Sequence, residues 1–367
     1  MKPLLCISLL VLPFVASPAS AQGTSPVVPT MFTHADAPAS IPFPFYYDKK
    51  RVQHLVEGSR FCTTSAVLFS FAYRIDGRSS GAPQAVSLPN LTISLGYSSK
   101  TAPTMSTTFA SNVQGTQTTV FSGTLNLPVQ SAPPAGLGSF NIVQKLSKPF
   151  IYQRSQGNLL IQHIVPGQAT QALTYTQLDG AVSGVPWGKF GTGGSFADQS
   201  QPTITIGNPT TINPGGSIDP TNPGMTSNYP TIHIYGFSSD SNGPLTLPFS
   251  LSPFGAPGNT LYCSLDLLVP ATLKGGGSSW DANSSVPIPN SQGLNGAAVF
   301  LSSMHVDLKA NKLGLVFGPA LGTTVGWQTS CGMAQLYAKD STATTGYFWI
   351  SGGGNGAPVI QLTGTFQ

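Results

Sequence analysis

The sequence predicts an all-β protein of two antiparallel β-sandwich domains, jelly-roll-like in style, joined by a Pro/Gly-rich linker. Three observations carry this prediction. Short stretches of alternating apolar and polar residues recur along the chain, for example at 67–75, 91–97 and 260–269. Turn residues such as Asp76 and Gly77 separate them. No apolar period of 3.6 residues persists for three turns, because Gly and Pro interrupt each candidate helix.

The composition fits the same class. Charged residues make up 8% of the chain, whereas about a quarter is usual, and there are 41 Gly and 32 Pro. Hydrophobic residues still account for 40%. Intrinsic disorder needs low hydrophobicity together with high charge, so this is the composition of sheets joined by Gly/Pro turns.

The charge balance argues against a nucleic-acid partner. The formal net charge is only +4, and no cluster of Lys and Arg could neutralise a row of phosphates. We therefore expect no nucleic-acid binding.

The N-terminus has the three parts of a secretory signal peptide. Lys2 forms a short basic region, residues 4–15 are apolar, and Ala19, Ser20 and Ala21 supply a small-residue cleavage site. We expect residues 1–21 to be removed and the mature chain to be secreted, periplasmic or on the cell surface. No later stretch is long and apolar enough to span a membrane, and residues 357–367 carry no hydrophobic anchor.

The remaining chain divides by composition. Residues 22–44 are rich in Pro, Ala and Ser and predict a flexible leader that packs, if at all, as an extended strap. Residues 45–206 form the expected N-terminal sandwich and residues 231–367 the C-terminal one. Between them, residues 207–230 contain five Pro and several Asn/Gly turn pairs, which predicts an extended linker.

Two segments resemble modules of exported bacterial β-sandwich proteins that have no established activity, some with a PEP-CTERM-type C-terminal sorting signal. The first, 50–165, is marked by 51–57 (RVQHLVE), 74–76 (RID), 106–112 (STTFASN), 119–123 (TVFSG), 149–152 (PFIY) and 157–160 (GNLL). The second, 235–326, is marked by 255–258 (GAPG) before Tyr262 and Cys263, 288–290 (IPN), Gly296, 310–311 (AN) and 314–315 (GL). The resemblance implies β-sandwich domains and export. This chain lacks the sorting signal, so anchoring by that route is not implied.

The chain contains few residues that could act in acid–base catalysis. The chain has eleven Asp and a single Glu, Glu57, whereas a glycosidase needs two carboxylates across a sugar cleft. A lone acid carries no acid–base argument. Whether the protein is an enzyme stays open at this point, and the scarcity of paired acids favours that it is not.

Two short motifs suggest metal binding. His305 and Asp307 form an H-x-D pair that one strand would place on the same face, as two metal ligands or as a base with its orienting acid. Asp240 and Asn242 have the D-x-N spacing of calcium loops, without the remaining oxygen ligands. Turns stabilised by Asx side chains explain the second motif equally well. We expect no cofactor, with calcium as the alternative.

Aromatic residues beside polar ones are the candidates for contact with a sugar ring. Tyr46, Tyr47, Trp187 and Trp280 have this setting, and packing in the core or at an interface is the alternative for all four.

Three cysteines follow the signal peptide. We predict a disulfide between Cys263 and Cys331, because both lie in the second half of the chain and an exported protein meets an oxidising compartment. Cys62 would be left over. Three buried thiols are the alternative.

These observations favour an exported, non-catalytic extracellular or cell-surface structural or binding protein, with a glycan or a cell-surface molecule as partner. A secreted polysaccharide-acting enzyme or a carbohydrate-binding module is the first alternative. The second is a self-associating subunit of a sheath or filament.

Overall fold

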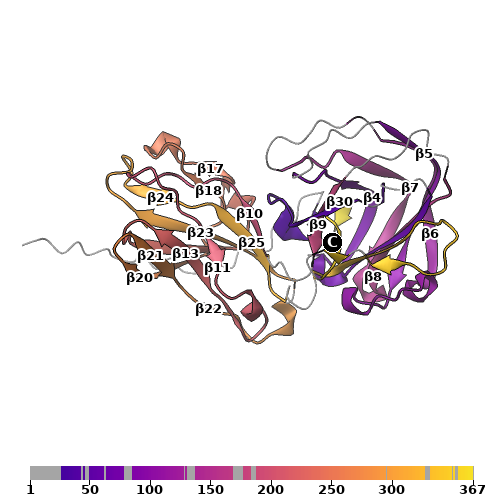
Figure 1. Ribbon diagram of the computed structural model, residues 1–367. Coiled ribbons are helices and arrows are strands. Elements are labelled where there is room, and N and C mark those ends of the chain that lie inside the picture. The colour runs from indigo at the N-terminus through magenta and orange to yellow at the C-terminus, as the bar shows by residue number, and fades with distance from the viewer. Residues whose placement is uncertain are drawn as a thin grey trace, which may run out of the picture.

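The computed structural model describes residues 26–42, 44–45, 49–61, 63–77, 85–127, 129, 137–167, 177–182, 187–294, 296–326, 331–348, 350–351 and 354–366. All paired strands in this part are antiparallel, which confirms the predicted all-β class (Figure 1). The helices are 3-10 turns of three or four residues: η1 (Thr30–Phe32), η2 (Gly58–Arg60), η3 (Ala102–Thr104), η4 (Phe109–Asn112), η5 (Arg154–Gln156), η6 (Pro209–Thr211), η7 (Ser252–Phe254) and η8 (Gln292–Leu294). None of these described helices has the length and apolarity needed to cross a membrane.

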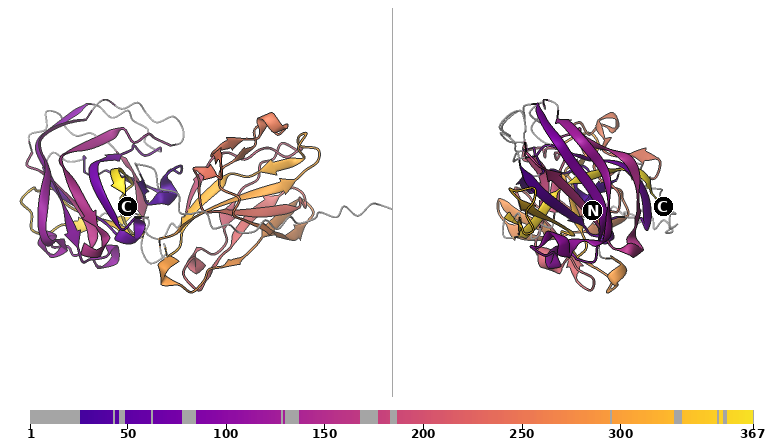
Figure 2. Two further views of the ribbon diagram at one scale, coloured as in Figure 1. Left: turned by 180° about the vertical axis from the view of Figure 1, so that it is seen from behind. Right: turned by 90° about the vertical axis from the view of Figure 1, so that its right-hand side faces the viewer.

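The strands gather into two lobes, seen side by side in Figure 1 and from behind in Figure 2. The first lobe contains three sheets, ordered β1-β30-β4-β7, β27-β26-β3-β8-β5-β6 and β2-β9-β29-β28. Its strands are β1 (Val27–Val28), β2 (Ala39–Ile41), β3 (Lys50–Val56), β4 (Ser65–Tyr73), β5 (Val86–Ser98), β6 (Gln114–Leu127), β7 (Ile142–Gln153), β8 (Asn158–Val165), β9 (Leu178–Val182), β26 (Met333–Ala338), β27 (Tyr347–Phe348), β28 (Ile350–Ser351), β29 (Gly354–Pro358) and β30 (Ile360–Phe366).

The second lobe packs a sheet ordered β10-β25-β23-β14-β19, with β24 beside β23, and a sheet ordered β11-β13-β21-β20. Its strands are β10 (Trp187–Phe190), β11 (Thr205–Ile206), β12 (Ser217–Ile218), β13 (Pro220–Met225), β14 (Thr231–Gly236), β15 (Ser241–Asn242), β16 (Leu245–Thr246), β17 (Phe249–Ser250), β18 (Thr260–Leu261), β19 (Leu267–Pro270), β20 (Thr272–Gly276), β21 (Ser279–Asn283), β22 (Val286–Pro287), β23 (Ala298–Val306), β24 (Leu315–Phe317) and β25 (Ala320–Thr324).

The expected domain boundaries, 45–206 and 231–367, differ from these lobes. After β25 the chain returns to the first lobe, where β26 pairs with β3 along its whole length and β30 pairs with β4. Conversely, β10 belongs to the second lobe through its pairing with β25. The lobe to which each segment belongs is therefore set by its pairing with strands that are distant in sequence. As a result, the second lobe is an insertion within the sequence of the first.

Residues 207–230 are not a linker between packed units, so that prediction is wrong. They contain β13, which lies between β11 and β21 in a sheet of the second lobe. Its prolines occupy positions that strands tolerate, because Pro220 opens the strand and Pro223 lies within the irregularity between Asn222 and Met225. The five prolines of this segment disfavour a helix, but they do not prevent a strand from forming.

The described part of the leader, residues 26–42 and 44–45, is an ordered strap and not a flexible segment. β1 pairs with β30, and β2 pairs with β9, so both ends belong to the first lobe. Between them, η1 packs on β10, β23 and β25 of the second lobe. Met31 and Phe32 are fully buried there. The strap is the indigo segment between the lobes in Figures 1 and 2, and it ties them together.

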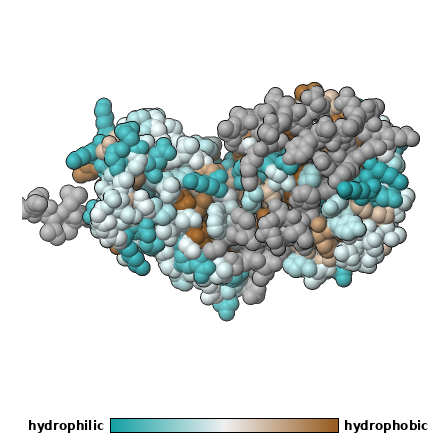
Figure 3. Space-filling view, viewed as in Figure 1, coloured by the Kyte–Doolittle hydropathy of each residue, from teal (hydrophilic) through white to brown (hydrophobic). Residues whose placement is uncertain are grey.

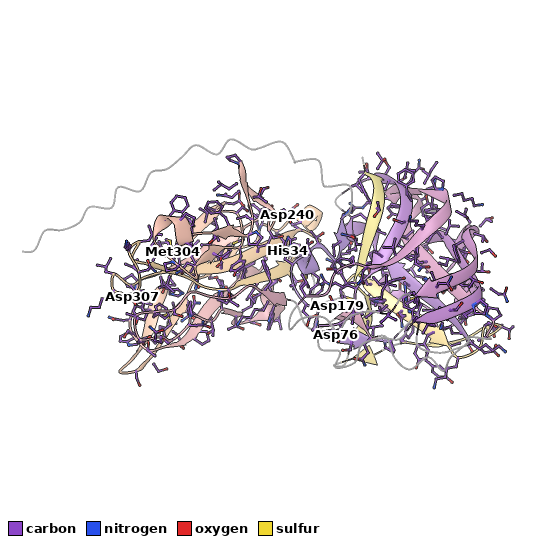
Figure 4. All side chains as sticks on the ribbon, turned by 90° about the horizontal axis from the view of Figure 1, so that it is seen from above. His34, Asp76, Asp179, Asp240, Met304 and Asp307 are labelled. Atoms are coloured by element: carbon purple, nitrogen blue, oxygen red, sulfur yellow. The ribbon has the colours of Figure 1, made fainter. Side chains whose placement is uncertain are left out.

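A buried ion pair holds this strap. Arg74 and Asp179 are 1% and 0% exposed, and Arg74 Nε donates to Asp179 Oδ2 at 2.6 Å. Each partner also bonds the strap: Arg74 donates to Ala35 O at 2.5 Å, and the Ala37 N–H donates to Asp179 Oδ1 at 2.7 Å. Burial raises the pKa of Asp179 to about 7, while Arg74 acts in the opposite direction. Asp179 lies at the junction of the lobes in Figure 4.

We predict that Asp179→Ala lowers the free energy of unfolding by about 3–5 kcal/mol, because it leaves the guanidinium of Arg74 buried without its counter-charge. Urea unfolding followed by circular dichroism measures the change. The double variant Arg74→Met with Asp179→Leu should lose less, since it leaves no lone charge. Asp340→Ala is the control: this half-exposed carboxylate pairs with Lys49 at the surface, where an ion pair contributes little, so the midpoint should change only slightly. A loss below about 1 kcal/mol for Asp179→Ala would contradict the role assigned to the pair.

Candidate functional site

A polar groove lies on the second lobe. It has a volume of about 480 Å³. Three segments line it: the loop 192–201 that follows β10, the turn 257–259 before β18, and residues 310–311 between β23 and β24. Two hairpin turns and the loop between β10 and β11 therefore meet at one place, which no single stretch of sequence shows.

Hydrogen bonds to the sheet fix the walls of this groove. The Gly194 N–H donates to Phe317 O at 2.8 Å, and the Phe317 N–H donates to Asn259 Oδ1 at 2.7 Å. Tyr262 clamps the start of the loop, since its hydroxyl accepts from the Thr192 N–H at 3.0 Å and donates to Thr192 O at 3.1 Å. The groove is thus preformed.

The lining of the groove is uncharged. The polar side chains are hydroxyls and amides, from Thr192, Ser195, Gln199, Gln201, Asn259 and Asn311. The remaining lining residues are Gly, Pro, Ala and Phe. Oδ1 of Asn311 is buried and has no hydrogen-bond partner among the described residues, while its Nδ2 donates to Leu315 O at 2.7 Å. Gln199 has a left-handed backbone with a φ of 67°, a conformation that non-glycine residues rarely adopt and that is found often at functional sites. Such a lining can hold a neutral ligand through hydrogen bonds, and none of its side chains titrates near neutral pH.

His305 and Asp307 support the groove from below. His305 lies under Phe196, the ring centroids being 5.3 Å apart, and Phe196 stacks on Tyr229 at 4.1 Å. Asp307 Oδ2 accepts from the Ala197 N–H at 2.8 Å and so holds the loop, while its Oδ1 accepts from the Lys309 N–H at 3.0 Å. The two predicted metal ligands therefore bond to different partners.

Both ring nitrogens of His305 are occupied inside the lobe. Nδ1 lies 2.9 Å from Thr231 Oγ1 and Nε2 lies 2.9 Å from Ser303 Oγ. In the part of the chain that the structure describes, no group of three or more His, Cys, Asp or Glu side chains is arranged to hold a metal ion.

The D-x-N motif is also divided. Asp240 is hydrogen-bonded to His34 of the strap, with Oδ1 2.6 Å from Nε2 (Figure 4). Asn242 Oδ1 instead accepts from the Leu265 N–H at 3.1 Å. The partner of Asn242 lies 23 residues away along the chain, so this hydrogen bond is not a local Asx turn, and Asp240 contributes to the contact between strap and second lobe.

The aromatic candidates lie away from the groove. Trp187 is half-buried in β10 against the core of the second lobe. Trp280 is half-buried in β21, where its Nε1 donates to Gly277 O at 3.1 Å. Tyr46 and Tyr47 fall outside the described residues. Packing accounts for both tryptophans.

The predicted disulfide between Cys263 and Cys331 is wrong. Both residues are buried and no bond joins them. Cys263 lies between β18 and β19 of the second lobe, whereas Cys331 precedes β26, which belongs to the first lobe. The prediction failed because it assigned the C-terminal segment to the second lobe. Cys62 falls outside the described residues.

The groove residues themselves were missed from the sequence. Of its segments, only 255–258 and 310–311 stand out in the sequence, as marks of the second module and not as a site. The available signal was the polarity of these turns combined with their lack of charge. Their convergence depends on the register of the sheet, which the sequence does not display.

A chain of buried hydrogen bonds runs through the second lobe beneath the groove. His233 Nε2 lies 2.7 Å from Asn222 Oδ1, and Asn222 Nδ2 donates to Ser303 Oγ at 3.0 Å, which in turn contacts His305. On the other side, His233 Nδ1 lies 2.7 Å from Ser284 Oγ. Burial lowers the pKa of His233 to about 4 and that of His305 to about 3. Both imidazoles are therefore neutral at pH 7.

These lowered pKa values predict acid sensitivity. An unfolded His has a pKa of about 6.5, so the unfolded chain binds protons more tightly than the folded one. The stabilisation is complete above about pH 6.5 and is lost as the pH falls toward 4, by on the order of 3 kcal/mol per buried His. Urea midpoints at pH 7, 6, 5 and 4 measure this. His233→Gln and His305→Gln should each flatten the dependence, and a slope equal to that of the unaltered protein would contradict the assignment.

Cys263 should be inert in the folded protein. Burial, with a smaller contribution from Asp266, raises the pKa of its thiol to about 12, and the thiolate is the reactive form. We expect no alkylation of Cys263 by iodoacetamide at pH 8 in buffer, and full alkylation in urea without reductant. Peptide mapping by mass spectrometry locates the label. Rapid labelling of the folded protein would contradict the observed burial, and protection in urea would indicate a disulfide.

Comparisons with known proteins gave no match: no protein-family model matches the chain, nor does any curated protein or solved structure. The resemblance to exported β-sandwich proteins stays a prediction from the sequence.

Proposed function

We propose that this chain is an exported, non-catalytic binding protein whose second lobe holds a neutral, polyhydroxylated ligand, a segment of a glycan, in the groove between 192–201, 257–259 and 310–311. The observation that carries the proposal is the uncharged lining of hydroxyls, amides and glycines around about 480 Å³. This volume falls within the range of about 300–1,000 Å³ that small-molecule sites occupy. A sugar offers many hydroxyls that both donate and accept, which suits amide side chains.

The absence of acids from the lining supports a binding role over hydrolysis. Glycoside hydrolysis needs two carboxyl groups roughly 5–10 Å apart on either side of the bond. None of the residues that line the groove is acidic. The single glutamate, Glu57, is in the first lobe, where its Oε1 accepts from the Ala102 N–H at 2.8 Å. Asp307 already accepts two backbone hydrogen bonds beneath the loop.

The low charge of the chain supports a neutral ligand. Figure 3 shows the described face of the second lobe mostly in pale shades, which correspond to residues of intermediate hydropathy. Phe196, the aromatic residue of the lining, is 2% exposed and stacks on Tyr229, so it forms the floor and offers no free face to a sugar ring. Binding would rest on hydrogen bonds, each contributing about 0.5–1.5 kcal/mol. The signal-like residues 1–21 support export, and the partner would then be extracellular.

The test is calorimetry of the mature chain with neutral hexaoses: cellohexaose, maltohexaose, xylohexaose, mannohexaose and chitohexaose. We expect binding to at least one of them and no release of reducing ends. The double variant Gln199→Gly with Gln201→Ala should weaken that binding about thirtyfold, because it removes two amides at about 1 kcal/mol each. Gly accepts the left-handed backbone at 199 without strain, so the fold should be kept.

Gln156→Ala, an exposed glutamine of the first lobe, is the matched control and should bind normally. The proposal fails if no hexaose binds, if the double variant binds as tightly as the control, or if reducing ends accumulate.

A further inference from the structure

A second, smaller hollow lies where the strap, the first lobe and the second lobe meet. It has a volume of about 190 Å³. His34 comes from the strap and Leu137 from the segment between β6 and β7, while the second lobe supplies Phe190, Pro248 and Tyr262. An engineered cavity of about 150 Å³ holds a benzene molecule, so this hollow has room for one aromatic ring or a short alkyl chain.

The walls of the hollow are apolar. The ring of Phe190 stands edge-on to that of Tyr262, with centroids 6.1 Å apart. Nε2 of His34 already bonds Asp240. The hydroxyl of Tyr262 is directed to the backbone of Thr192. An occupant would therefore gain from burial of apolar surface and find few polar partners.

Tyr262 lines the hollow and is hydrogen-bonded to a residue that lines the groove. Its ring lines the hollow, whereas its hydroxyl bonds both backbone groups of Thr192, which lines the groove. Gly191 allows this approach: a Cβ there would lie 2.3 Å from Tyr262 Cζ, and its φ is +73°. A polar site and an apolar site are thus separated by one residue.

We propose that the ligand is amphiphilic, a glycoside whose sugar occupies the groove while an aryl or short alkyl aglycone fills the hollow between His34, Leu137, Phe190, Pro248 and Tyr262. This inference rests on the proposed function and adds the chemical class of the ligand. It also gives the strap and the first lobe a part in recognition, because His34 and Leu137 bring one wall of the hollow.

The experiment compares p-nitrophenyl glycosides with the unsubstituted disaccharides by calorimetry, using cellobiose, maltose, xylobiose and chitobiose. For the disaccharide that binds, we expect the nitrophenyl group to tighten binding at least tenfold. Leu137 is 36% exposed, so Leu137→Asp should fold normally and abolish that gain, while leaving the affinity for the unsubstituted sugar unchanged. Leu268→Asp, on a surface leucine 46% exposed in β19, is the matched control and should keep the gain.

The outcomes separate the two proposals. If neither sugars nor glycosides bind, both the proposed function and this inference are overturned. If sugars bind and the nitrophenyl group adds nothing, or if the gain survives Leu137→Asp, only the amphiphilic ligand is overturned. Release of nitrophenolate during the titration would overturn the non-catalytic assignment.

Discussion

The arrangement of the two lobes depends on the buried pair of Arg74 and Asp179. β4 leads into Arg74, Asp179 belongs to β9, and both side chains bond the backbone of the strap at Ala35 and Ala37. Such a pair is costly to desolvate, and it stabilises only when the remaining hydrogen-bonding groups are satisfied. Here the strap supplies partners to Arg74 Nη2 and Asp179 Oδ1, while Arg74 Nη1 has no hydrogen-bond partner among the described residues. The position of the strap then places η1 on the second lobe and His34 opposite Asp240, so one electrostatic contact organises the junction.

Within the second lobe, a separate set of buried hydrogen bonds fixes the residues of the groove. The carboxylate of Asp307 fixes the loop 192–201 from beneath, and the chain of His233, Asn222, Ser303 and His305 fixes the sheet under it. Each imidazole has a partner at both nitrogens. Fully satisfied networks of this kind specify one arrangement of a core, because every alternative leaves a buried polar group without a partner. Rigidity of the floor is what a preformed groove needs.

The first lobe also buries a pair of histidines, with a different character. The rings of His54 and His163 lie 5.4 Å apart, and His163 has no hydrogen-bond partner at either nitrogen among the described residues. Burial lowers the pKa of His54 to about 3 and that of His163 well below its usual value. Both lobes therefore oppose proton uptake by burying neutral imidazole, and their stabilities should decline in the same direction as the pH falls.

The sequence by itself determined the secondary structure and the chemical inventory. Alternation at 67–75 and 91–97 and the density of turn residues predicted strands that are present as β4 and β5, whereas the strand expected over 260–269 is interrupted at 262–266. The scarcity of acids predicted that few residues could do acid–base chemistry. These two predictions depend on local periodicity and on composition, which the sequence shows directly. The Pro-rich stretch 207–230 marked the limit of this reasoning, because Pro reports backbone dihedrals and not strand partners.

Only the tertiary structure decided which strands pair and which turns meet. The return of β26 and β30 to the first lobe separated Cys331 from Cys263. The meeting of two hairpin turns with the loop after β10 made a groove from residues that individually predict only turns and loops. The register of two strands that are distant in sequence depends on which side chains each register buries on the two faces of the sheet. Those side chains come from many parts of the chain. No local pattern encodes the register, and so the site could not be found before the fold.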